Sequence, residues 1–132
     1  MKPERILVLA GGLSGAAGVA LSATAAHAGG GNIGTAASFL LMHAPVFLAI
    51  GLLAGRGADG PEPARNDAGP GLLHLAAYAL LAGLVLFSGD LLLRDSAGTR
   101  VFLMAAPAGG MLMILGWLGI AAAGLRRGAS WP

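Results

Sequence analysis

The chain has 132 residues, of which 56% are hydrophobic and only 11% charged, with a formal net charge of +2. About a quarter of an ordinary globular domain is charged, so this composition excludes a typical water-soluble domain and indicates a protein that is solvated by lipid. The eight basic residues lie in short segments without interleaved aromatic residues, which argues against nucleic-acid binding, and the lack of cysteine excludes disulfides and thiolate chemistry.

The sequence contains four long apolar runs, at about 6–28, 36–54, 72–93 and 101–125; the glycine-rich segment 29–35 separates the first two, and charged segments separate the others. About 20 apolar residues are enough for a helix to cross the hydrocarbon core of a bilayer. The runs are continuous and rich in alanine and leucine, whereas strands would alternate apolar and polar residues. The sequence therefore predicts an all-α integral membrane bundle of four transmembrane helices, forming a single domain over residues 1–132.

The first run can also be read as a secretory signal peptide. It follows Lys2 and Arg5 and ends on Ala26-His27-Ala28, a sequence that satisfies the small-residue rule for cleavage. Its apolar stretch of about 20 residues is longer than the 7–15 residues of a signal core. We therefore expect an uncleaved first helix, with His27 at its outer boundary.

Small residues recur four or seven positions apart in the first and fourth runs. Such spacing lets helix backbones approach closely in lipid. The spacing predicts helix packing, either within the bundle or against another subunit. The residues concerned are Gly11 and Gly15 on one row of the first helix, Ser14, Gly18 and Ser22 on the next, and Gly109 and Gly116 on the fourth.

The segment 55–71 (GRGADGPEPARNDAGPG) is rich in glycine, proline and charge, which is typical of a flexible exposed loop. It is too short to form a separate catalytic domain. With four spans, this loop and both termini share one side of the membrane. That side carries six basic residues against two on the other, which predicts that both termini are cytoplasmic. The six are Lys2, Arg5, Arg56, Arg65, Arg126 and Arg127, and the two are Arg94 and Arg100.

Ionisable residues inside a membrane span are functional candidates by default. His27, His43 and Asp90 are all expected in the outer half of the bilayer, whereas His74 is expected near the inner boundary. The first three residues are compatible with a proton-handling pair, with a metal site of two histidines and a carboxylate, or with a buried hydrogen-bond network. Asp90 is also within reach of Arg94, four residues later on the same helix face.

Four short motifs occur in order along the chain: residues 13–21 (LSGAAGVAL) followed by Ala26-His27, residues 42–44 (MHA), residues 86–89 (LFSG), and residues 107–110 (PAGG) followed by Gly116-Trp117. Together they resemble the YgdD-like family of small bacterial membrane proteins, domain of unknown function 423. The resemblance implies a four-helix inner-membrane protein that retains its first helix and has no established activity.

The histidines and Asp90 relate differently to this family pattern. His27 and His43 match motif positions of the family. Where the family commonly has Ser-Leu-Tyr after Phe-Ser-Gly, this chain has Asp90-Leu91-Leu92. A role for Asp90 would therefore be particular to this protein.

No nucleophile elbow, phosphate-binding loop or zinc helix motif is present, so we expect no enzymatic activity and no cofactor. The favoured interpretation is an accessory or assembly subunit in the bacterial inner membrane, whose partners are the lipid bilayer and either other membrane subunits or copies of itself, and not nucleic acid. One alternative is an oligomeric transporter or channel for protons or small solutes that uses His43 and Asp90. A second alternative is a metal- or cofactor-binding protein that uses His27 and His43.

Overall fold

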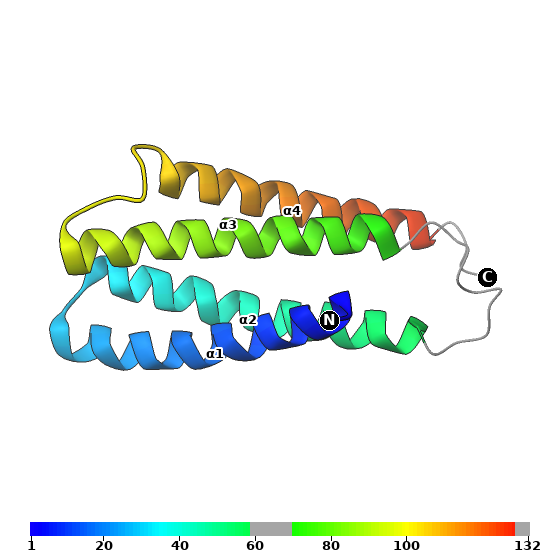
Figure 1. Ribbon diagram of the computed structural model, residues 1–132, viewed down its shortest axis with the longest axis horizontal. Coiled ribbons are helices and arrows are strands. Elements are labelled where there is room, and N and C mark those ends of the chain that lie inside the picture. Colours follow the sequence, from blue (N-terminus) through cyan, green and yellow to red (C-terminus); the bar gives the residue numbers. More distant parts are fainter. Residues whose placement is uncertain (59–69, 129–132) are drawn as a thin grey trace.

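The computed structural model describes residues 1–58 and 70–128, which form four helices arranged as two antiparallel hairpins (Figure 1). The first hairpin consists of α1 (Pro3–Ala28) and α2 (Gly31–Ala58), and the second of α3 (Pro70–Ala97) and α4 (Ala105–Gly128). The predicted loop at 55–71 lies largely outside the described residues, while its two ends belong to α2 and α3.

All four helices are long enough and apolar enough to cross a membrane. The shortest has 24 residues, which corresponds to about 36 Å at 1.5 Å per residue, against a hydrocarbon core of about 30 Å. Large apolar side chains lie exposed on their outer faces, such as Leu13 at 70% and Leu118 at 61% exposure. Surfaces of this kind suit lipid and not water.

The fourth helix begins at Ala105, four residues after the start of its apolar run. Residues 101–104 instead form a turn, in which the Ala105 N–H donates to the Phe102 carbonyl at 3.1 Å. Pro107 lies in the first turn of α4, where its missing N–H has no helical acceptor to lose. At the connection between α1 and α2, Gly29 caps the end of α1, and its positive φ of 68° is the left-handed conformation that glycine adopts easily.

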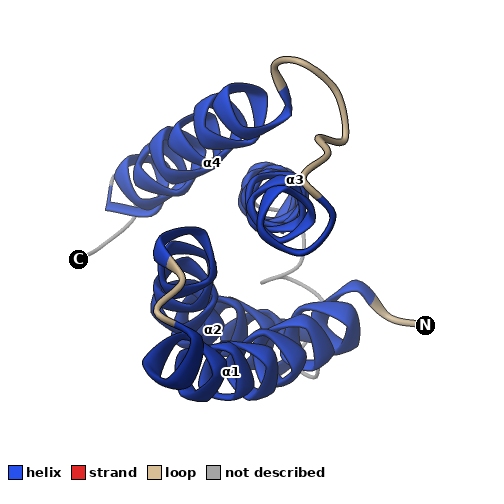
Figure 2. Cartoon of the chain, turned by 90° about the vertical axis from the view of Figure 1, so that its left-hand side faces the viewer, coloured by secondary structure: helices blue, strands red, loops and turns tan. Residues whose placement is uncertain are grey.

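The helices pack in a row from α1 to α4 and do not close into a ring (Figure 2). α1 packs along α2 and α3 along α4, while the two hairpins are joined mainly by α2 and α3, with a smaller contact between α1 and α3 where the Tyr78 hydroxyl donates to the Pro3 carbonyl at 3.4 Å. Within the described residues, no Cα atom of α4 lies within 8 Å of a Cα atom of α1 or α2. The outer faces of α1 and α4 are therefore separated from each other and both face outward.

Glycines set the close approach of α1 to α2. A Cβ atom added at Gly11 would lie 2.8 Å from the carbonyl oxygen of Ala44, and one added at Gly18 would lie 2.6 Å from Cγ of Leu41. Ser14 is buried on the same face. Gly11, Ser14 and Gly18 thus lie at the contact of α1 with α2.

Not every residue of the predicted small face takes part in this contact. A Cβ atom at Gly15 would make only an ordinary contact with Ala44, at 3.6 Å. Ser22 is exposed near the end of α1.

Glycines also set the close approach of α3 to α4. Gly109 faces Gly83 so closely that a Cβ atom on either residue would lie 2.7 or 2.8 Å from backbone atoms of the opposite helix. One added at Gly116 would meet the backbone N of Leu80 at 2.8 Å. Gly109 and Gly116 thus lie where α4 packs closely against α3.

The hydrophobic core lies between the two hairpins, and α3 contributes more of its buried side chains than any other helix. All four helices supply buried side chains to it. They are Leu7 from α1, Phe47 and Ile50 from α2, Ala77, Leu80 and Leu84 from α3, and Met113 from α4.

Candidate functional site

His43 lies on the inner face of α2 and is only 3% exposed. Its Nδ1 atom is 2.7 Å from the carbonyl oxygen of Phe39, one turn earlier. Its Nε2 atom is 3.3 Å from Nε1 of Trp117 on α4. Because a carbonyl only accepts and an indole N–H only donates, the ring must carry its proton on Nδ1 and accept at Nε2. Both nitrogens of the neutral imidazole are thereby satisfied.

Aromatic rings surround this imidazole. Phe39, His43 and Phe47 are spaced four residues apart on α2, so their rings follow one face of the helix. Phe39 packs against Phe87 of α3 with ring centroids 4.7 Å apart, and His43 packs against Trp117 of α4 at 5.9 Å. The face therefore forms the junction between the first hairpin and the second.

The Trp117 side chain of α4 reaches α2, although no Cα atoms of these two helices lie within 8 Å of each other in the described residues. It is 43% exposed, so one side of the ring faces outward while the indole N–H points to His43. An indole N–H in an apolar environment needs an acceptor. His43 supplies it, which ties α4 to the first hairpin.

Asp90 is a second buried polar group, and it lies near the end of α3, at the other end of the bundle from the start of α1. Its side chain is completely buried. Oδ2 forms a salt bridge with Arg94 on the same helix, as the spacing of four residues predicted. Oδ1 accepts a 2.9 Å hydrogen bond from the Val101 N–H in the α3–α4 connection. The carboxylate thus holds the connection against the end of α3.

His27 lies in the last turn of α1, where its side chain is exposed. It contacts neither His43, whose two nitrogens are bonded to Phe39 and Trp117, nor Asp90, which binds Arg94 and Val101. Over residues 1–58 and 70–128, no three His, Cys, Asp or Glu side chains are placed to hold a metal ion. The sequence left open whether His27, His43 and Asp90 converge, and the structure does not bring the three side chains together.

Sequence reasoning missed the part played by Trp117 and by Gly83. Trp117 entered the prediction only as part of a motif, although a lone indole N–H within an apolar span is itself a sign of a buried acceptor nearby. Gly83 stands four residues after Ala79 and seven after Ala76, a small-residue spacing that the sequence reasoning did not single out. The structure adds that this position packs against Gly109.

Comparison of the sequence with models of known protein families shows which family it matches. A family model described as "Protein of unknown function (DUF423)" matches residues 14–110. The match begins in α1 and ends in the second turn of α4, so it includes His27, His43 and Asp90 and stops before Trp117. Comparisons with the curated proteins and with the solved structures gave no match. Since the family match spans well over half of the sequence, the chain belongs to the DUF423 family of proteins of unknown function.

Proposed function

We propose that this DUF423 protein is a non-enzymatic accessory or assembly subunit that packs against a larger complex in the bacterial inner membrane. The observation that carries the proposal is that two buried polar side chains, His43 and Asp90, already bind other groups of the chain. His43 and Asp90 are each engaged in holding helices or connections together. A transport path or a catalytic centre needs such groups to be available to a solute or substrate.

The open arrangement of the helices supports a role in assembly. α1 and α4 end the row on separate sides and carry exposed apolar residues, including Leu13 and Leu118. A transmembrane helix of another protein can pack on such a face without displacing any contact within this chain. Lipid competes with a partner helix for this face, so association of the two proteins depends on complementary shape and close packing.

We propose that both termini lie in the cytoplasm. The described basic residues support this orientation, because Lys2, Arg5, Arg56 and Arg126 gather at the end of the bundle where α1 begins and α2 and α4 end. Arg94 and Arg100 belong to the opposite end.

Native mass analysis of protein extracted from its own membranes with a polymer that retains lipid tests the proposal. We expect a species larger than the monomer that contains at least one different membrane protein. Leu13→Trp and Leu118→Trp enlarge one outer face each and identify the contact surface, because only the variant on the partner's face should release the partner. A monomer, or an oligomer of this chain alone, after every mild extraction would contradict a subunit role.

A further inference from the structure

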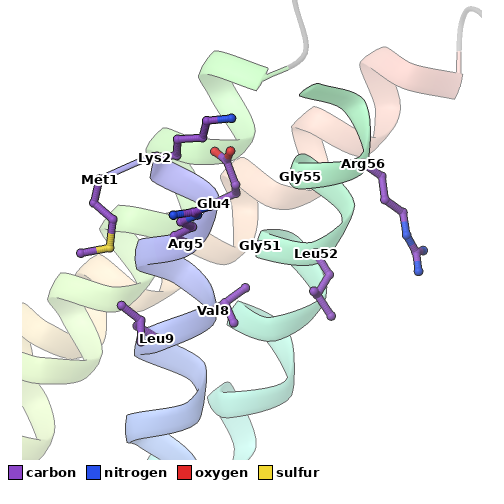
Figure 3. A pocket seen from close by; sticks show the side chains of 10 residues that line it. All are labelled: Met1, Lys2, Glu4, Arg5, Val8, Leu9, Gly51, Leu52, Gly55 and Arg56. Carbon is purple, nitrogen blue, oxygen red and sulfur yellow. The ribbon is translucent and has the colours of Figure 1, made fainter. Parts of the chain in front are cut away.

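We propose that the groove between the start of α1 and the end of α2 binds the headgroup of an anionic phospholipid. The groove is an open cavity of about 750 Å³ at the end of the bundle that holds the N-terminus (Figure 3). This volume falls in the range of about 300–1,000 Å³ that is typical of small-molecule sites. The inference goes beyond the proposed function and does not depend on it.

Two glycines on α2 shape the floor of the groove. At Gly51 the helices touch, since an added Cβ atom would lie 2.8 Å from the Glu4 carbonyl oxygen and 2.8 Å from Cγ2 of Val8. One turn later, at Gly55, the nearest atom to an added Cβ is Cγ of Glu4 at 3.7 Å. The helices therefore separate beyond Gly51, and the absence of a side chain at Gly55 keeps the space open.

The charge of the groove favours an anion. Lys2 and Arg5 from α1 and Arg56 from α2 line it, with Glu4 as the only carboxylate among its lining residues. Within the described residues, none of the three cations forms an ion pair.

The apolar part of the groove identifies the anion as a lipid. Val8 and Leu9 lie further along α1 than Lys2 and Glu4, and Leu52 lies on α2 below Gly55 (Figure 3). A ligand that fits both parts has a phosphate group at the basic rim and hydrocarbon along these side chains. Basic pockets between transmembrane helices recognise the headgroups of anionic lipids in this way. Free phosphate would leave the apolar wall without a partner.

Native mass spectrometry of the full chain in detergent tests the inference, with dioleoyl phosphatidylglycerol and dioleoyl phosphatidylcholine as probes. We expect phosphatidylglycerol to bind more tightly. Each of the changes Lys2→Gln, Arg5→Gln and Arg56→Gln should lower the preference about fivefold, the value of one basic residue near an anionic headgroup. The triple variant should bind both lipids equally.

Arg126→Gln is the matched control, because Arg126 is an exposed cation at the same end of the bundle that does not line the groove. It should leave the preference unchanged. Gly55→Leu fills the groove without removing charge and should weaken the binding of both lipids. Excess inorganic phosphate should not displace phosphatidylglycerol.

Four results would overturn the inference. They are equal binding of the two lipids by the unaltered protein, an unchanged preference in the triple variant, a loss in Arg126→Gln as large as that in Arg56→Gln, and complete displacement by inorganic phosphate. The last of these would identify a site for free phosphate instead of lipid.

Discussion

The Nε1–H of Trp117 donates a 3.3 Å hydrogen bond to Nε2 of His43, and this bond connects two helices whose Cα atoms stay more than 8 Å apart throughout the described residues. The same imidazole donates through Nδ1 to the Phe39 carbonyl. His43 therefore joins α4 to α2 with no nitrogen left for a ligand. His43 thus acts as a structural link between these two helices.

Trp117→Phe should destabilise the protein by about 1 kcal/mol, because the change keeps an aromatic ring but leaves the buried Nε2 of His43 without its donor. Thermal unfolding of the purified protein in detergent measures this loss. A double-mutant cycle with His43→Leu should give a coupling energy of about 0.6 kcal/mol, the mean for hydrogen bonds between transmembrane helices. A coupling energy of zero would show that the two side chains do not interact.

Asp90→Leu should destabilise the α3–α4 connection more than Asp90→Asn does. The asparagine retains an oxygen that accepts from the Val101 N–H, whereas leucine loses this bond and leaves Arg94 without its partner. Hydrogen exchange at the Val101 amide should be fastest in Asp90→Leu and intermediate in Asp90→Asn. Equal exchange in all three proteins would mean that Asp90 does not hold the connection.

Gly109→Ala should lower the free energy of unfolding by about 1–3 kcal/mol, because its Cβ atom would lie 2.7 Å from the backbone N of Phe87 and the α3–α4 pair would have to separate. Gly110→Ala provides the neighbouring control, since an added Cβ there meets nothing within 4 Å. That change should be neutral or stabilising by up to about 1 kcal/mol. Equal effects of the two changes in thermal unfolding would contradict the observed helix contact.

His27→Ala should change the free energy of unfolding by less than about 0.5 kcal/mol, because the side chain is exposed at the end of α1. His43→Ala should cost at least about 1 kcal/mol, since it leaves the Trp117 donor without an acceptor. Thermal unfolding of both variants under the same conditions measures the two changes in free energy side by side. A larger loss of unfolding free energy in His27→Ala than in His43→Ala would contradict the exposed position of His27.

The four long apolar helices could be predicted from the sequence because their signal is local. Uninterrupted apolar runs of sufficient length determine the helices, and the spacing of four residues between Asp90 and Arg94 determines their contact. The start of α4 at Ala105 could not be found in this way. Residues 101–104 are as apolar as the helix that follows, and their turn depends on the bond from Val101 to Asp90, eleven residues away.

The contacts between helices were harder to predict, because each depends on two faces that are distant in the sequence. His43, Asp90 and His27 were expected to share the outer half of the membrane, but equal depth does not bring side chains together. The rotation of α2 directs His43 toward Trp117, 74 residues later in the sequence. Gly109 was recognised as a packing residue by its spacing, while its partner Gly83 emerged only once α3 and α4 were aligned.

The protonation pattern of His43 tests the structural role of this residue most directly. Nitrogen-15 NMR of the full chain, labelled at its three histidines, distinguishes the two neutral forms and the cation, and His43→Gln assigns the signal. At neutral pH the account predicts a single neutral form with the proton on Nδ1, and a change in the Nε2 signal in Trp117→Phe. A proton on Nε2, or an Nε2 signal unaffected by Trp117→Phe, would contradict the claim that His43 fastens α4 to α2.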